Sequence, residues 1–146
     1  MNKKVINATA VSQDGINFRS KAERTFYNLI KETGFDFQYE PKPLVLMEGF
    51  YPKPWHEGMK EHTEKVRNMT YTPDFMVCVN GHTFLIEVKG MATDRYIVKR
   101  KLLLNYLRQV DSYHFFEVHT KRDMLFCIEK IKECEYTSPK NEEPSP

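Results

Sequence analysis

Residues 71–90 read YTPDFMVCVNGHTFLIEVKG, two apolar-rich stretches on either side of Asn80-Gly81. An Asn-Gly pair between such stretches is the strongest short-range signal for a two-residue β-turn, because both residues adopt positive φ at low cost. The segment therefore predicts a β-hairpin with strands over 71–79 and 82–89.

Two acidic side chains face each other across this predicted hairpin. A two-residue turn pairs Val79 with His82, and successive pairs outward from the turn bring Asp74 opposite Glu87. Directly opposed carboxylates repel each other and destabilise a sheet. A hard divalent cation such as Mg²⁺ removes that penalty, since it takes carboxylate oxygens as ligands. A one-residue slip at the turn is the alternative, and it would separate the pair.

The second strand also places a lysine on the acidic side of the hairpin. Because side chains alternate between faces, Glu87 and Lys89 share one face, opposite an apolar stripe. The stripe consists of Phe84, Ile86 and Val88. An ammonium group beside the acids can hold an attacking water or stabilise negative charge that develops on a phosphate. The alternative interpretation is a solvated strand face with a Glu87–Lys89 ion pair.

A third acid belongs to the first predicted helix. Ser20 and Glu23 have the spacing of a capping box, and the helix continues to about Thr33, where Gly34 ends it. Glu23 falls at the edge of the apolar face, roughly in line with Ile30. We keep two interpretations: Glu23 caps the helix, or it supplies a third carboxylate to the hairpin site.

The remaining segments complete an α/β pattern. We expect a bent or edge strand over 37–46, a polar insertion over 47–70, a helix from Thr93 or Asp94 to about Arg108, a strand over 113–119 and a helix over 121–132. Residues 1–17 look extended or irregular, with a turn at Asp14-Gly15. This order predicts a mixed β-sheet flanked by helices, in one domain over 1–133 followed by a disordered tail over 134–146.

Composition narrows the classes of protein to which the chain can belong. Of its 146 residues, 40% are apolar and 29% charged, which is typical of a soluble globular domain. There is no apolar run of about 18 residues and no secretion signal, so we expect a cytoplasmic protein without membrane attachment. The three scattered cysteines fit neither a disulfide framework nor a zinc site.

Basic residues are concentrated in one segment, although the net charge is only +2. Between Lys89 and Lys101 there are five Lys or Arg residues and one acid. Such a local excess is typical of contacts with a nucleic-acid backbone. The candidates for DNA contacts are Arg95, Lys99, Arg100 and Lys101. The alternative for Arg100 is an arginine that reaches outward from the core face of the helix.

Four motifs occur in the order found in a known group of nucleases. They are DGINFRSKAE (14–23), YTPDF (71–75), IEVKG (86–90) and the basic segment 89–102. Together they resemble the PD-(D/E)XK superfamily, in particular small phage and prophage endonucleases and, more distantly, phage endonuclease I-type Holliday junction resolvases. The resemblance implies a restriction-endonuclease-like fold. It also implies catalytic roles for Glu23, Asp74, Glu87 and Lys89, and Mg²⁺ or Mn²⁺ bound by the three acids and the carbonyl of Val88.

The same resemblance implies a Mg²⁺-dependent endodeoxyribonuclease that acts on branched DNA, such as a Holliday junction in DNA recombination. It also implies a phage or prophage protein in the bacterial cytoplasm and a homodimer. Val98, Leu102 and Tyr106 form a second apolar stripe on the helix that begins near residue 94, and this stripe is a candidate for the dimer interface. The alternatives are a non-catalytic DNA-binding module with the same basic surface and an RNA-processing nuclease on the same fold.

Overall fold

The computed structural model describes residues 9–136, which fall into two compact units. The first, which we call the sheet unit, contains residues 9–41, 73–91 and 112–136. The second, which we call the arm unit, contains residues 42–72 and 92–111. The sequence predicted one domain with an insertion at 47–70. The structure instead groups that insertion with a helix from the C-terminal half of the chain.

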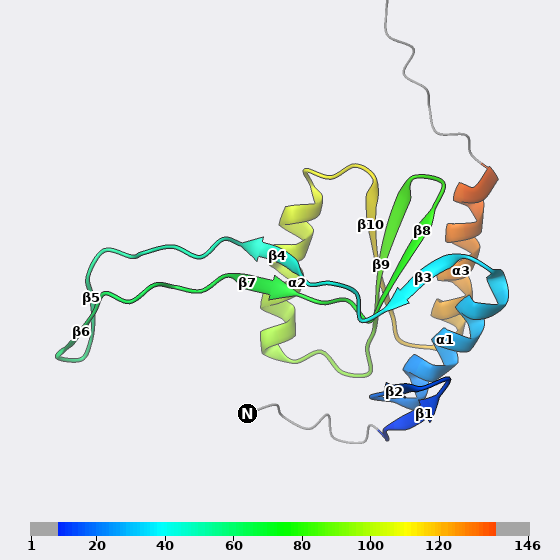
Figure 1. Cartoon of the computed structure of the whole chain (residues 1–146), viewed down its shortest axis with the longest axis horizontal. Coiled ribbons are helices and arrows are strands. Elements are labelled where there is room, and N and C mark those ends of the chain that lie inside the picture. The colour runs from blue at the N-terminus through cyan, green and yellow to red at the C-terminus, as the bar shows by residue number, and fades with distance from the viewer. Residues whose placement is uncertain (1–8, 137–146) are drawn as a thin grey trace, which may run out of the picture. The chain divides into compact units, whose positions relative to one another are not determined.

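The sheet unit is built on a four-stranded mixed sheet (Figure 1). Its strand order is β10 (Tyr113–Val118), β9 (His82–Val88), β8 (Phe75–Val79), β3 (Asp36–Tyr39). The β8–β9 and β3–β8 pairs are antiparallel, whereas β10 runs parallel to β9. The predicted α/β class with a mixed sheet is confirmed.

The central hairpin has the register that the sequence predicted. Phe75 pairs with Ile86 and Val79 with His82, and the turn residues Asn80 and Gly81 have φ values of 49° and 80°. No bulge shifts the strands between these pairs. The β8–β9 ladder ends at Phe75, so Asp74 comes directly before the first paired residue.

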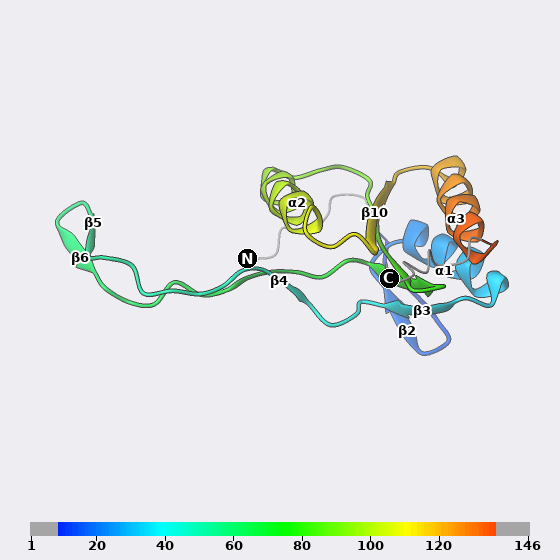
Figure 2. The ribbon, with the colours of Figure 1, turned by 90° about the horizontal axis from the view of Figure 1, so that it is seen from above.

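Two helices pack with this sheet around one core (Figure 2). They are α1 (Lys21–Thr33) and α3 (Lys121–Tyr136). The predicted apolar stripe of β9 contributes the buried Phe84 and Ile86, and Val88 packs against them half-buried. Helix residues fill the other side of this core: Phe26, Tyr27, Ile30, Met124, Cys127, Ile128 and Ile131.

The predicted boundaries of α1 are confirmed. The Ser20 side chain accepts a hydrogen bond from the backbone N–H of Glu23 at 3.1 Å, as an N-cap does. Gly34 ends the helix with φ 74°, the left-handed conformation that glycine adopts most easily.

Several predicted segments differ from the structure. The irregular N-terminal segment contains a hairpin of β1 (Val11–Gln13) and β2 (Ile16–Phe18) around the predicted Asp14-Gly15 turn. The α3 helix continues to Tyr136, so the predicted tail begins too early. Its remaining residues, 137–146, lie outside the described part of the chain.

The arm unit consists of a long antiparallel ribbon and one helix (Figure 1). The ribbon pairs β4 (Leu44–Met47) with β7 (Met69–Tyr71) and β5 (Trp55–Glu57) with β6 (Lys60–His62). The helix is α2 (Asp94–Leu107), with Thr93 as its N-cap, as predicted. The predicted strand over 37–46 is wrong, because it is two strands of different sheets: Glu40 has φ 46°, and two prolines follow it. The predicted strand over 71–79 is likewise divided: Tyr71 ends β7, and β8 begins at Phe75, so residues 72–74 belong to neither strand.

No helix among residues 9–136 is long and apolar enough to cross a membrane.

Candidate active site

One pocket of the sheet unit brings together side chains that are far apart in the sequence. It has a volume of about 460 Å³ and is formed by the start of α1, the residue before β8, the end of β9 and the residue after β10. The predicted residues that line it are Glu23, Asp74, Glu87, Val88 and Lys89. All five residues that the resemblance singled out therefore lie in a single pocket.

Three carboxylates of this pocket are almost completely buried. Glu23, Asp74 and Glu87 are 5%, 6% and 8% exposed. Asp74 accepts a hydrogen bond from the backbone N–H of Val88 at 2.8 Å on one oxygen, Oδ2. Buried acids normally need a compensating charge, because removal from water penalises the ionised form.

The neighbouring acids influence the pKa of Asp74. Burial raises the pKa of Asp74 well above its ordinary value of 3.8, and the negative charges of Glu87 and then Glu23 raise it further. The Val88 N–H and the positive charge of Arg19 lower the pKa, but they do not cancel the effect. A cation in the pocket would therefore favour the ionised form of Asp74, which burial and the neighbouring acids disfavour.

Glu23 both caps α1 and faces the pocket. Its Oε2 accepts hydrogen bonds from the backbone N–H of Arg19 at 2.9 Å and from the hydroxyl of Tyr39 at 2.8 Å. Burial, and then this hydrogen bond to Glu23, raise the pKa of Tyr39, so the phenol remains a donor. The two interpretations of Glu23 are therefore compatible: one oxygen closes the helix start, and the side chain still lines the pocket.

We expect Tyr39→Phe to lower the melting temperature, because Glu23 then loses a donor in a buried setting. A hydrogen bond to a charged group contributes about 1.5–3 kcal/mol, which corresponds to a decrease of roughly 3–10 °C for a chain of this length. Thermal unfolding followed by circular dichroism measures the shift. Tyr113→Phe is the matched control, since the Tyr113 hydroxyl has no hydrogen-bond partner within residues 9–136. Equal shifts in the two variants would contradict the role of Tyr39.

Glu87 and Lys89 form an ion pair at the end of β9. The Lys89 Nζ lies 3.6 Å from the Glu87 Oε1, and the two side chains are 21% and 10% exposed. The ion pair of the alternative interpretation is thus present, but its setting is a pocket wall rather than a solvated strand face. In such a setting the ammonium group keeps more of its electrostatic influence than it would in water.

Sequence reasoning missed two residues beside this lysine. The His119 Nδ1 lies 2.7 Å from the backbone oxygen of Lys89, and its Nε2 lies 2.8 Å from the Glu117 Oε2. The backbone N–H of Lys89 donates to the Val118 oxygen at 2.9 Å. The backbone of Lys89 is therefore held on both sides by the end of β10.

A signal for these residues exists in the sequence. Glu87-Val88-Lys89 and Glu117-Val118-His119 have the same acid–valine–base pattern, each at the end of a strand. Parallel pairing aligns Glu87 with Glu117. The same pattern on two adjacent parallel strands places two acids and two bases at one edge of the sheet.

A family model described as "Protein of unknown function (DUF1064)" matches residues 3–121. The chain belongs to the DUF1064 family. No curated protein matches the chain. The matched region includes all the pocket residues discussed above, from Arg19 to His119, so the pocket belongs to the DUF1064 region itself.

The donor set of the DUF1064 pocket fits a hard divalent cation by its chemistry. Carboxylate and carbonyl oxygens, as offered by Glu23, Asp74, Glu87 and Val88, are the ligands that Mg²⁺ and Mn²⁺ take in proteins. No three His, Cys, Asp or Glu side chains between residues 9 and 136 are already arranged as a metal cage.

The candidate DNA contacts of this DUF1064 protein lie in the arm unit. Arg95 and Lys99 line a second pocket there, which is described below. The Arg100 guanidinium lies 5.6 Å from the centre of the Tyr96 ring, in agreement with an arginine that extends over the core face of α2. Lys101 is exposed and lines neither pocket.

Proposed function

We propose that this DUF1064 protein is a Mg²⁺-dependent nuclease that hydrolyses phosphodiester bonds of DNA. The observation that carries the proposal is the convergence of three buried carboxylates and one lysine in a single pocket. Buried like charges destabilise a fold unless something compensates them, so their retention in one pocket favours a catalytic role. The resemblance of the four motifs to the PD-(D/E)XK superfamily supports the same class of reaction.

The roles of the residues follow from their positions. Glu23, Asp74, Glu87 and the Val88 carbonyl would hold Mg²⁺ or Mn²⁺, which supplies positive charge at the phosphate and makes a bound water more acidic. The Lys89 ammonium group would orient the attacking water or stabilise the charge that develops on the phosphate oxygens. Glu87 directs that ammonium group, and the end of β10 fixes its backbone.

The proposal extends to branched DNA and to a homodimer. One pocket supplies one acidic cluster and cuts one strand, whereas resolution of a four-way junction needs two symmetric cuts. A two-fold dimer supplies two such pockets. The α2 stripe supports this part of the proposal: Val98 is 53% exposed, and Leu102 and Tyr106 are half-buried. A phage or prophage origin and a place in the bacterial cytoplasm are also part of the proposal, and the first of these rests on the motif resemblance alone.

Cleavage assays on matched substrates test the proposed function. We expect the wild-type protein to cut labelled DNA with Mg²⁺ or Mn²⁺ and not with EDTA, with a four-way junction cut faster than linear duplex or single-stranded DNA. Glu87→Gln, which keeps the size of the side chain and removes its charge, is expected to lose this activity. Cutting of RNA alone would favour the RNA-processing alternative. DNA binding without any cleavage in either metal would favour a non-catalytic module.

A further inference from the structure

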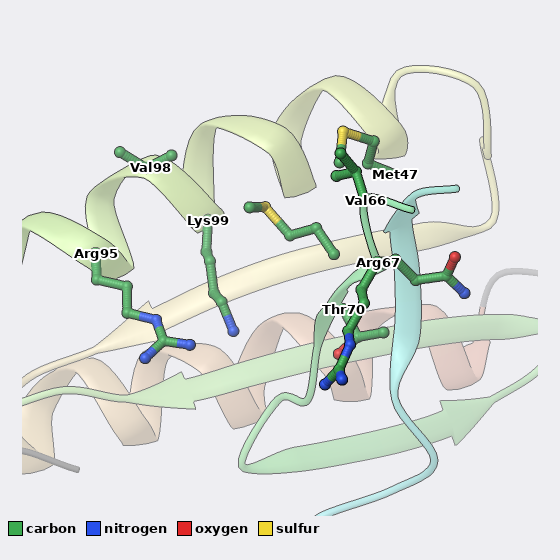
Figure 3. A pocket seen from close by; sticks show the side chains of 9 residues that line it. Met47, Val66, Arg67, Thr70, Arg95, Val98 and Lys99 are labelled. Carbon is green, nitrogen blue, oxygen red and sulfur yellow. The ribbon is translucent and has the colours of Figure 1, made fainter. Parts of the chain in front are cut away.

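The arm unit contains a pocket that is lined by three basic side chains. It has a volume of about 460 Å³ and lies between α2 and the 66–70 segment of the ribbon. Figure 3 shows Arg95 and Lys99 extending from α2 and Arg67 extending from the ribbon in the same direction. Sequence reasoning selected Arg95 and Lys99 as DNA contacts, but it did not associate Arg67 with them.

No acid of the described chain neutralises these three cations. The side chains of Arg67, Arg95 and Lys99 form no ion pair or hydrogen bond with any residue between 9 and 136. Arg95 also lies in the first turn of α2, where the helix dipole is positive and an acidic side chain would be favoured. The pocket is therefore a region of uncompensated positive charge that an anion would stabilise.

The ribbon side of the pocket is rigidly built. Phe50 and Val66 exchange two backbone hydrogen bonds of 2.9 and 2.8 Å, and the Asn68 side chain accepts from the Gly49 N–H at 2.5 Å. A Cβ atom at Gly49 would lie 2.8 Å from the Val66 oxygen, so only glycine allows this close approach. Arg67 thus lies between Val66, whose backbone pairs with Phe50, and Asn68, whose side chain is bonded to Gly49, and this order lowers the entropic cost of holding an anion.

The helix side is also ordered. Arg95 and Lys99 are four residues apart and so lie on the same face of α2, one turn from each other. The Thr93 side chain caps the helix by accepting from the Tyr96 N–H at 3.2 Å. The α2 helix and the ribbon therefore both place cationic side chains at this pocket.

The charge of the whole arm unit indicates a polyanion rather than a single small anion. Residues 42–72 and 92–111 contain ten Lys and Arg against six Asp and Glu, a net charge of +4. The rest of the chain contains twelve Lys and Arg against fourteen Asp and Glu, a net charge of −2. The pocket also has apolar walls from Met47, Val66 and Met69, against which sugar rings can pack.

We propose that Arg67, Arg95 and Lys99 bind the phosphodiester backbone of nucleic acid. This inference deepens the proposed nuclease function, because it names a binding site apart from the carboxylate pocket. It does not require that the carboxylate pocket be active. Contacts of this kind fix the position of the protein on the strand and do not depend on base sequence.

The salt dependence of DNA binding tests the site. In EDTA, where no cleavage is expected, fluorescence anisotropy with labelled duplex DNA gives the affinity at several salt concentrations. Each lost phosphate contact should reduce the slope of log K against log salt by about 0.9, which corresponds to roughly a tenfold loss at about 0.1 M salt. For the triple variant Arg67→Ala/Arg95→Ala/Lys99→Ala we therefore expect the loss of up to three phosphate contacts, with the corresponding decreases in slope and in affinity. The single variant Arg95→Gln should lose one phosphate contact.

The matched control removes the same charge from the same unit. Lys42→Ala/Lys53→Ala/Arg108→Ala deletes three cations of the arm unit that do not line the pocket, and we expect it to change the affinity only a few-fold. Equal losses in the two triple variants would overturn the proposal, since bulk charge would then explain binding. Melting curves establish that each variant is folded.

Competitors identify the anion. Polyphosphate should displace DNA from the wild type, whereas poly-glutamate at equal charge and millimolar inorganic phosphate should not. Displacement by inorganic phosphate would indicate a site for free phosphate, and displacement by poly-glutamate a site for acidic polypeptides; either result would overturn the assignment. If the wild type binds DNA through this pocket but never cleaves it, the proposed function alone fails. If it cleaves DNA and the pocket variant binds with an unchanged salt slope, this inference alone fails.

Discussion

Replacing Lys89 with alanine is expected to reduce the rate of DNA cleavage by about 10²–10³-fold at saturating DNA. The ammonium group lies against Glu87 in the carboxylate pocket, and its backbone is held by hydrogen bonds with Val118 and His119. A group held this firmly needs little reorganisation to act on a phosphate, so its loss affects the chemical step. DNA affinity should change by no more than a few-fold, because one cation supplies a small part of the backbone attraction.

Single-turnover cleavage of labelled DNA in Mg²⁺ measures the first effect, and anisotropy in EDTA the second. Lys21→Ala is the matched control, since Lys21 lines the same pocket but is exposed and lies outside β9. We expect that variant to cut DNA within a few-fold of the wild-type rate. A Lys89→Ala protein that is folded and cuts at the wild-type rate would show that the lysine has no catalytic role.

Replacing Asp74 with asparagine is expected to have opposite effects on stability and on metal binding. The pKa of Asp74 is raised in the folded protein, so the folded state binds this proton more tightly than the unfolded chain does. Its contribution to the free energy of unfolding is therefore most favourable below the ordinary pKa of 3.8 and is lost as the pH rises through the folded pKa. At pH 7 without metal, the carboxylate destabilises the fold.

Asparagine removes that penalty and retains the local hydrogen bonding. Its carbonyl oxygen can still accept from the Val88 N–H, and its amide can donate to Glu23 or Glu87. In EDTA at pH 7 we expect Asp74→Asn to melt higher than the wild type by about 3 °C or more, which corresponds to about 1 kcal/mol. The difference should shrink as the pH is lowered toward the ordinary pKa of Asp74.

Metal should reverse this order. Mg²⁺ or Mn²⁺ at about 100 times its dissociation constant stabilises a folded protein by about 2.7 kcal/mol, and Asp74→Asn should lose most of that gain. Differential scanning calorimetry across pH, with and without metal, measures both effects. Asp36→Asn, at an exposed position of β3, is the control and should behave as the wild type does. Equal metal shifts in Asp74→Asn and the wild type would remove Asp74 from the metal site.

Local rules account for the parts of the fold that the sequence predicted. The Asn80-Gly81 turn sets the pairing of Phe75 with Ile86, and Ser20 and Gly34 mark the ends of α1. All of these depend on residues that are close together in the chain. The turn also predicted Asp74 opposite Glu87, but the ladder ends at the Phe75–Ile86 pair, and the Asp74 side chain accepts a hydrogen bond from the Val88 N–H instead.

The parts that sequence reasoning missed depend on distant partners. His119 and Glu117 reach Lys89 and Glu87 only because β10 pairs with β9 in parallel, across a connection that includes α2. Arg67 lines the same pocket as Arg95 and Lys99 only because the ribbon lies against α2. The α2 helix has only a weak division into apolar and polar faces, and its Leu104 is 48% exposed.

The parallel pairing of β9 with β10 also sets the order in which the pocket can assemble during folding. The β8–β9 hairpin closes over two residues, so Asp74 and Glu87 can meet early and quickly. The contact between His119 and Lys89 closes a loop more than ten times longer, and non-local parallel pairs form slowly. A newly made chain thus brings Asp74 and Glu87 together before the backbone of Lys89 is held by β10. Amide hydrogen exchange at Lys89, whose N–H bonds to Val118, reports the moment at which the pocket becomes complete.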